Sequence, residues 1–108
     1  MAYSESIATF VEDQLSGIGY LRTKKMFGAL AFYCDDVLFG AVMDENFTLK
    51  AQASIQGEFE AMGMTRHQIK GRDIKMPYFD VTSEILENRD QLLKWTSLSL
   101  NALKSKLC

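Results

Sequence analysis

Three short apolar segments separated by acidic breaks constrain the fold of this chain more than any other feature of its sequence. The segments are residues 24–33, 37–43 and 47–50, and the breaks are residues 35–36 and 44–46. Breaks of two or three polar residues suit the tight turns of β-hairpins. In the third segment apolar and polar side chains alternate, which indicates a sheet with one face toward water. We therefore predict three neighbouring strands.

Segments with helical periodicity flank these strands. From Ser4 to Leu15 the apolar residues recur at helical spacing, and Ser4 is expected to cap the helix. A short helix over residues 54–62 is expected to end at Gly63. Residues 88–91 have the form of a capping box, which predicts the start of a long amphipathic helix at the C-terminal end.

A second hairpin is expected between the short helix and the long one. Residues 68–70 and 74–79 predict two strands around a turn at residues 71–73. Pro77 lacks a backbone N–H, so we expect its strand to lie at an edge or to bulge there. The order α-β-β-β-α-β-β-α, without a linker or repeat, predicts a single domain over residues 1–108. We predict an α+β fold of two layers, in which helices pack on an antiparallel five-stranded sheet.

The composition is that of a folded chain with a small negative charge. Of the 108 residues, 47% are hydrophobic and 24% are charged, and the net charge is −2 with a pI near 5.3. Strong non-specific binding to nucleic acid requires a surplus of Lys and Arg, so this balance argues against it. No apolar run reaches the ~18 residues that a membrane span needs, and the N-terminus does not read as a signal peptide. We expect a cytoplasmic protein that makes no membrane contact.

Residues able to carry catalysis or hold a metal are few. His67 is the only histidine and stands in a polar stretch before a predicted strand, so we expect it at the surface or at a hairpin end. Cys34, Cys108 and His67 together fall short of the four ligands of a structural zinc site. A nucleophilic Cys34 paired with His67 is the less favoured alternative, because it requires the two to meet in space. We assign no catalytic, metal-binding or cofactor-binding residue and predict that the chain is not an enzyme.

Two groups of basic residues remain as candidate contact sites. The first group lies where the N-terminal helix leads into the sheet: Arg22, Lys24 and Lys25. The second lies on the second hairpin: Arg66, Lys70, Arg72 and Lys75. Their simplest interpretation is solvated charge beside scattered acids. Their functional interpretation is a surface for an acidic protein partner or for DNA phosphate, and the net negative charge favours the protein.

A set of short motifs runs in order along nearly the whole chain. They are Lys25-Met26-Phe27-Gly28, Phe32-Tyr33, Asp35-Asp36, Leu38-Phe39-Gly40, Asp44, Phe47-Thr48-Leu49-Lys50, Phe59-Glu60-Ala61-Met62-Gly63, Met76-Pro77-Tyr78-Phe79 and Leu93-Lys94-Trp95. As a set they resemble the N-terminal domain of the TfoX/Sxy family of bacterial competence regulators. The chain departs from the family pattern at Ala29, where a second small residue is common, at Ala31, where the family often has Gly, and at Pro77, where it has Ser.

The resemblance implies a fold and a pathway. The implied fold has the layout α-β(3)-α-β(2)-α, shared with secretion chaperones, which matches the element order predicted above. The implied role is regulation of transcription and DNA-uptake competence, with the transcription machinery or a CRP-like activator as partner. The family implies no catalytic residues. Competence regulators of this kind carry a second, C-terminal domain, so we expect this chain to be a stand-alone single-domain member.

Three hypotheses for the function follow. The first is a non-enzymatic regulatory module that acts through protein contacts, with a homodimer as one arrangement. The second is a direct DNA-binding domain that uses Arg22, Lys24 and Lys25. The third is a small-ligand-binding domain or enzyme with a pocket beside Gly28 and Gly40.

Overall fold

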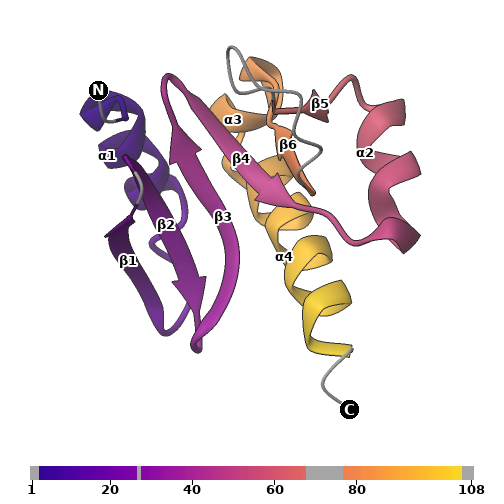
Figure 1. Ribbon diagram of the computed structural model, residues 1–108, viewed down its shortest axis with the longest axis horizontal. Helices are drawn as coiled ribbons and strands as arrows, with labels where there is room; N and C mark the ends of the chain where they lie inside the picture. Colours follow the sequence, from indigo (N-terminus) through magenta and orange to yellow (C-terminus); the bar gives the residue numbers. More distant parts are fainter. Residues whose placement is uncertain (1–2, 27, 68–76, 106–108) are drawn as a thin grey trace.

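The computed structural model describes residues 3–26, 28–67 and 77–105, which form one curved sheet covered by helices (Figure 1). The strands are β1 Leu21–Met26, β2 Ala29–Cys34, β3 Val37–Met43, β4 Asn46–Lys50, β5 Thr65–Arg66 and β6 Tyr78–Asp80. The helices are α1 Glu5–Gln14, α2 Gln56–Ala61, α3 Ser83–Glu87 and α4 Arg89–Ser105, with a 3-10 turn, η1 Ala53–Ile55, before α2.

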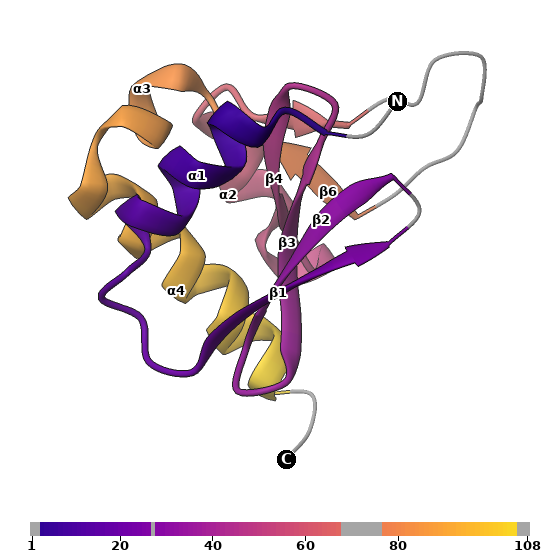
Figure 2. The same cartoon turned by 90° about the vertical axis from the view of Figure 1, so that its left-hand side faces the viewer.

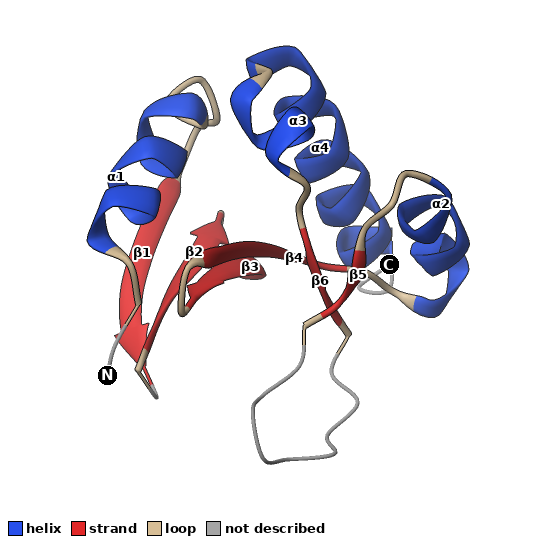
Figure 3. Cartoon of the chain, turned by 90° about the horizontal axis from the view of Figure 1, so that it is seen from above, coloured by secondary structure: helices blue, strands red, loops and turns tan. Residues whose placement is uncertain are grey.

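The sheet has the order β1-β2-β3-β4-β6-β5, and all its neighbouring strands are antiparallel. Viewed from above, the helices lie on one side of it (Figure 3). The predicted α+β fold of two layers is therefore confirmed. The predicted number of five strands is wrong, because six strands occur in the described part of the chain.

The additional strand arises from residues 24–33, which the sequence analysis took as one strand. The structure divides them into the end of β1 and most of β2, and Met26 pairs with Ala29 across the turn. Gly28 makes this turn with φ of 76°, a conformation that glycine adopts without steric cost. As a result, Lys24 and Lys25 belong to β1, which is the outermost strand of the sheet.

The turns and helix ends follow the local signals in the sequence. Asp35 and Asp36, both at positive φ, form the two-residue turn between β2 and β3, and Asp tolerates this conformation better than most residues. The Ser4 hydroxyl accepts a hydrogen bond from Ile7 N–H at the start of α1, and the Asn88 side chain accepts one from Gln91 N–H at the start of α4. These predicted caps are confirmed.

The second hairpin differs from its prediction. Residues 68–76, with the basic residues Lys70, Arg72 and Lys75, lie outside the described residues. The described pairing joins Thr65 to Asp80 and Arg66 to Phe79. Strand β6 lies between β4 and β5, so it is not an edge strand. Pro77 precedes β6 and uses only its carbonyl, which accepts a hydrogen bond from Ala51 N–H at 2.7 Å. The missing N–H of Pro77 therefore breaks no ladder bond inside β6.

The core lies between the sheet and the helices. Its largest fully buried side chains are Phe32, Phe39, Phe47, Phe59, Phe79, Leu15, Leu49, Met64 and Leu92. Aromatic rings meet edge to face in two groups, Phe32 with Phe39 and Phe47, and Phe59 with Phe79 and Trp95. Trp95 is 5% exposed, so it is a core residue and not part of an exposed interface.

Candidate functional site

The three candidate contact residues all lie on β1, at one edge of the sheet. Figure 2 turns this edge toward the viewer. Arg22, Lys24 and Lys25 are each exposed. The strand register sets their directions, because directly paired residues of antiparallel strands point to the same face. Lys25 pairs with the buried Leu30 and so lies on the helix-covered face, whereas Arg22 and Lys24 lie on the opposite face.

Arg22 already has an acidic partner. Its guanidinium forms an ion pair with Asp36 in the β2–β3 turn, and both side chains are largely exposed. Exposed pairs of this kind contribute roughly 0–1 kcal/mol to stability, since water and salt screen them. The ion pair therefore orients Arg22. A partner that replaced Asp36 would lose little free energy by breaking the pair.

Lys24 and Lys25 have no comparable partner. The residues opposite them on β2 are Ala31 and Leu30, and neither β1 nor β2 contains an acidic residue. Among the residues that the structure describes, neither lysine forms an ion pair. The end of β1 nearer to Met26 is thus positively charged, whereas its beginning lies beside Asp35 and Asp36.

A tyrosine that the sequence analysis did not single out stands at the beginning of this edge. Tyr20 is 81% exposed and has φ of 60°, which is rare for a bulky residue. Its carbonyl accepts a hydrogen bond from Asp35 N–H, and with Arg22, Asp35 and Asp36 it lines a shallow hollow of about 220 Å³. Nothing in the local sequence predicts this exposure, because an aromatic residue before a strand is usually part of the core.

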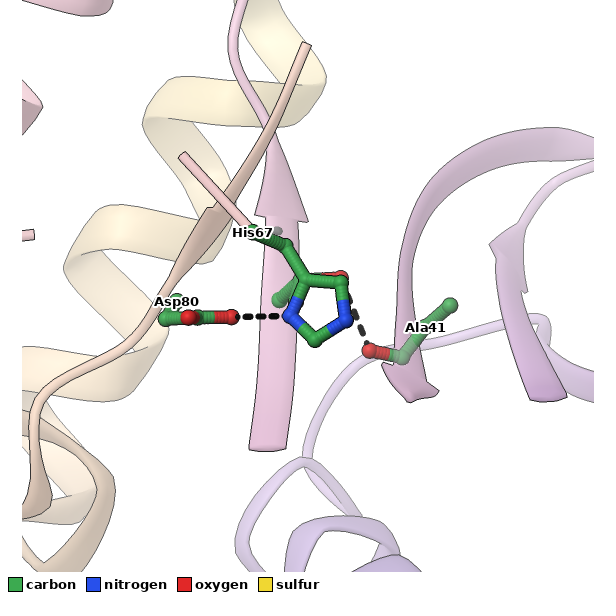
Figure 4. A network of polar contacts seen from close by, with 4 residues as sticks. Ala41, His67 and Asp80 are labelled. Carbon is green, nitrogen blue, oxygen red and sulfur yellow. Dashed lines mark hydrogen bonds and ion pairs between the residues drawn. The ribbon is translucent and has the colours of Figure 1, made fainter. Parts of the chain in front are cut away.

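A second polar cluster lies on the sheet face opposite the helices (Figure 4). His67 is 3% exposed, so the surface position is wrong, whereas the alternative of a hairpin end fits its place directly after β5 and opposite Tyr78. Its Nδ1 lies 2.8 Å from an Asp80 carboxylate oxygen, and because a carboxylate only accepts hydrogen bonds, Nδ1 carries the proton. The fully buried Thr48 pairs with Asp80 across β4 and β6 and donates its hydroxyl hydrogen to the Ala41 carbonyl at 2.9 Å.

The arrangement of this cluster suits a structural role. The His67 main chain also pairs with β6, since its N–H donates to the Tyr78 carbonyl. Together the two bonds of His67 tie the segment after β5 to β6. The Cys34 thiol, by contrast, bonds to the Gly19 carbonyl, so the described contacts of Cys34 and His67 do not form the nucleophile and base pair considered above.

Replacement of His67 by alanine is expected to lower the free energy of unfolding by about 1.5–3 kcal/mol, the range for hydrogen bonds to charged groups. Urea unfolding of His67→Ala, Asp80→Ala and the double variant measures the coupling between the two side chains. Both single variants should be destabilised, and the double variant should be less destabilised than their sum. Additive losses would show that the bond contributes nothing beyond packing.

The pH dependence of the free energy of unfolding tests the same sheet face through Tyr78. Burial raises the pKa of the Tyr78 hydroxyl above its ordinary value of 10.0, and Tyr33 raises it further. A group with a raised pKa in the folded state contributes its stability below the unfolded pKa and loses it as the pH rises through the folded pKa. We therefore expect unfolding to become easier above pH 10, and Tyr78→Phe should reduce this alkaline loss. An unchanged alkaline profile in Tyr78→Phe would contradict the assignment.

Outside these two clusters, the described residues offer few groups that could bind a ligand or carry a reaction. Among them, no group of three or more His, Cys, Asp or Glu side chains is placed to hold a metal ion. The space beside Gly40 is filled by Thr48, Leu49 and Phe47, which leaves no room there for the ligand of the third hypothesis. Within the same described residues, no helix has the length and apolar character to cross a membrane.

Comparison with known proteins places the chain in a family. No curated protein matched it. The family model of the TfoX N-terminal domain matches residues 13–103 of the 108, from the end of α1 to the last turns of α4. Because the match covers most of the chain and all six strands, the chain belongs to the TfoX N-terminal domain family.

Proposed function

We propose that this chain is a non-enzymatic regulatory module that acts through protein contacts in the control of transcription and DNA-uptake competence. Membership of the TfoX N-terminal domain family supports the pathway. The observation that carries the mode of action is the edge strand β1, which has a neighbour on one side only in the described sheet and presents three exposed basic residues. An edge strand offers unpaired backbone groups to another chain, and exposed charges select which chain binds.

A direct role in DNA binding is the second candidate, and the direction of the side chains speaks against it. A DNA backbone that lies along one face of the sheet reaches Arg22 and Lys24 but not Lys25, which lies on the other face. Arg22 is also paired with Asp36. Two or three phosphate contacts on a chain of net charge −2 provide little of the counterion release that drives non-specific binding.

Affinity purification from the source organism tests the proposed mode of action. The tagged full chain should recover a defined protein partner from the transcription machinery or a CRP-like activator. Recovery of no specific protein would count against a protein-contact module. A salt titration with duplex DNA checks the alternative in parallel, since a steep loss of affinity with salt would indicate direct phosphate binding.

Deletion of the gene tests the proposed pathway separately. We expect altered transcription of competence genes and altered DNA uptake in the deletion strain, and restoration by the intact gene. A transcriptome that changes elsewhere but leaves competence genes unaffected would contradict the proposed pathway. It would not bear on whether β1 is a contact surface.

A further inference from the structure

We infer that β1 binds an extended acidic segment of a different protein, which adds to the sheet as a seventh strand beside β1. This inference rests on the proposed function and specifies the surface and the chemistry of its partner. Three observations carry it: the unpaired edge, the distribution of charge along β1, and the exposed Tyr20 at its beginning.

The backbone of β1 provides the first requirement. Every second residue of a strand turns its N–H and C=O toward the same neighbour, and among the described strands β1 has such a neighbour only in β2. The strand is six residues long, whereas the other edge strand, β5, has two. The β1 edge is therefore the longer of the two ladders that the described sheet offers to an added strand.

The charge of β1 selects the occupant. An added strand has side chains on both faces of the sheet, so two consecutive acidic residues would approach Lys24 on one face and Lys25 on the other. Opposite charges on neighbouring strands stabilise the pairing, and like charges destabilise it. Near Tyr20, Asp35 and Asp36 would repel a further acidic residue, so we expect an apolar side chain against the tyrosine ring.

The same charges exclude a second copy of this chain as the occupant. Antiparallel pairing of two β1 strands about a two-fold axis places Arg22 opposite Lys24 of the other copy, or Lys24 opposite itself. Both registers bring like charges together, and no acid in β1 or β2 compensates them; only Arg22 has an acidic neighbour, Asp36, with which it is already paired. Exposed lysines on an edge strand commonly prevent this kind of self-association. A homodimer of this chain would therefore use another surface.

Tyr20 provides an anchor for the added strand. Tyrosine and arginine are over-represented among the residues that dominate binding energy at protein interfaces. Here Tyr20 and Arg22 line the same hollow at one end of the edge. An aromatic ring that is 81% exposed gains apolar contact only when another molecule covers it.

The experiment uses the full chain and a fluorescent peptide with the sequence Val-Thr-Val-Glu-Glu-Val-Thr-Val, whose symmetric pattern suits either strand direction. Fluorescence anisotropy measures affinity, and amide hydrogen exchange identifies the protected strand. We expect binding in the micromolar to millimolar range, with slower exchange confined to β1 amides. A peptide with Gln in place of both Glu residues should bind about tenfold more weakly, the equivalent of roughly 1.4 kcal/mol.

Matched variants separate charge from fold. Lys24→Glu should weaken the Glu peptide about tenfold and remove its advantage over a Lys-Lys version, because Lys25 stays cationic on the other face. Only the double variant Lys24→Glu/Lys25→Glu should reverse the preference. Lys94→Glu, at an exposed position of α4, makes the same change in net charge as Lys24→Glu and should leave binding unaffected. Tyr20→Ala should weaken binding without changing the preference for Glu. A peptide with a fully N-methylated backbone keeps its side chains but should not bind, since it cannot form the ladder.

Several outcomes would overturn the inference. These are equal affinity of the unchanged chain for the Glu and Lys peptides, binding of the N-methylated peptide, protection of amides outside β1, or no binding at millimolar peptide. The proposed function has a separate readout. If affinity purification recovers the same partner with Lys24→Glu as with the unchanged chain, the module acts through protein contacts but not through β1. If the unchanged chain itself recovers no specific partner, the proposed function fails even where the peptide binds.

Discussion

Replacement of Phe59 by alanine is expected to lower the free energy of unfolding by about 3–5 kcal/mol, as for other large aromatic residues in cores. Phe59 is fully buried on α2 and meets two rings edge to face, Phe79 of β6 at 5.9 Å and Trp95 of α4 at 5.0 Å. Its removal leaves a cavity among three elements that are far apart in the sequence. Because domains of this size have a total stability of about 5–15 kcal/mol, the loss is a large part of the whole.

Urea unfolding measures this loss, and Phe10→Ala provides the control. Phe10 is the same residue type on α1 but is 39% exposed, so its replacement should cost about 1 kcal/mol or less. The midpoint of unfolding should fall in Phe59→Ala while the denaturant slope stays the same. Equal losses in the two variants would show that α2 does not close the core as the structure indicates.

Replacement of Gly40 by alanine is expected to destabilise the fold by about 3 kcal/mol, at the upper end of the range for overpacked sites. A Cβ atom at Gly40 would overlap the carbonyl oxygen of Thr48 on β4. This neighbour is backbone, so no side-chain rotation relieves the contact. Strand β3 also pairs with β2 on its other side, so it cannot move away from β4 without disturbing that ladder.

Gly57→Ala is the matched control and should change stability in the opposite direction. Gly57 lies in α2, and nothing stands within 4 Å of the position of its missing Cβ. Alanine is the better helix former, so this variant should gain up to about 1 kcal/mol. The two glycine variants together distinguish a steric requirement from a general effect of adding a methyl group. A gain in both would contradict the close approach at Gly40.

The fold class could be predicted because its signals are local. Ser4 and Asn88 cap helices through residues three positions ahead, and Asp35 and Asp36 form a turn between adjacent strands. The strand count was wrong for a related reason. The run from Lys24 to Tyr33 is suited to strand throughout, and one glycine within it does not distinguish a continuous strand from a two-residue hairpin.

The candidate site could be predicted only in part. Arg22, Lys24 and Lys25 were identified from their clustering, but their split between two faces follows from the pairing of β1 with β2. The surroundings of the exposed Tyr20 are also non-local, since its carbonyl pairs with Asp35, which the chain reaches fifteen residues later. Side-chain direction in a sheet alternates with every residue, so a strand assigned in the wrong place carries no reliable information about faces.

By itself, the sequence determined the helix caps, the acidic turns, the antiparallel α+β class and the basic character of one segment, since each depends on residues close together in the chain. The tertiary structure decided that this segment is the outer edge of the sheet and that His67 is buried against Asp80. Both results depend on pairing between distant strands. The free energy of such pairing comes from burial and backbone bonds that form only when the whole sheet is assembled.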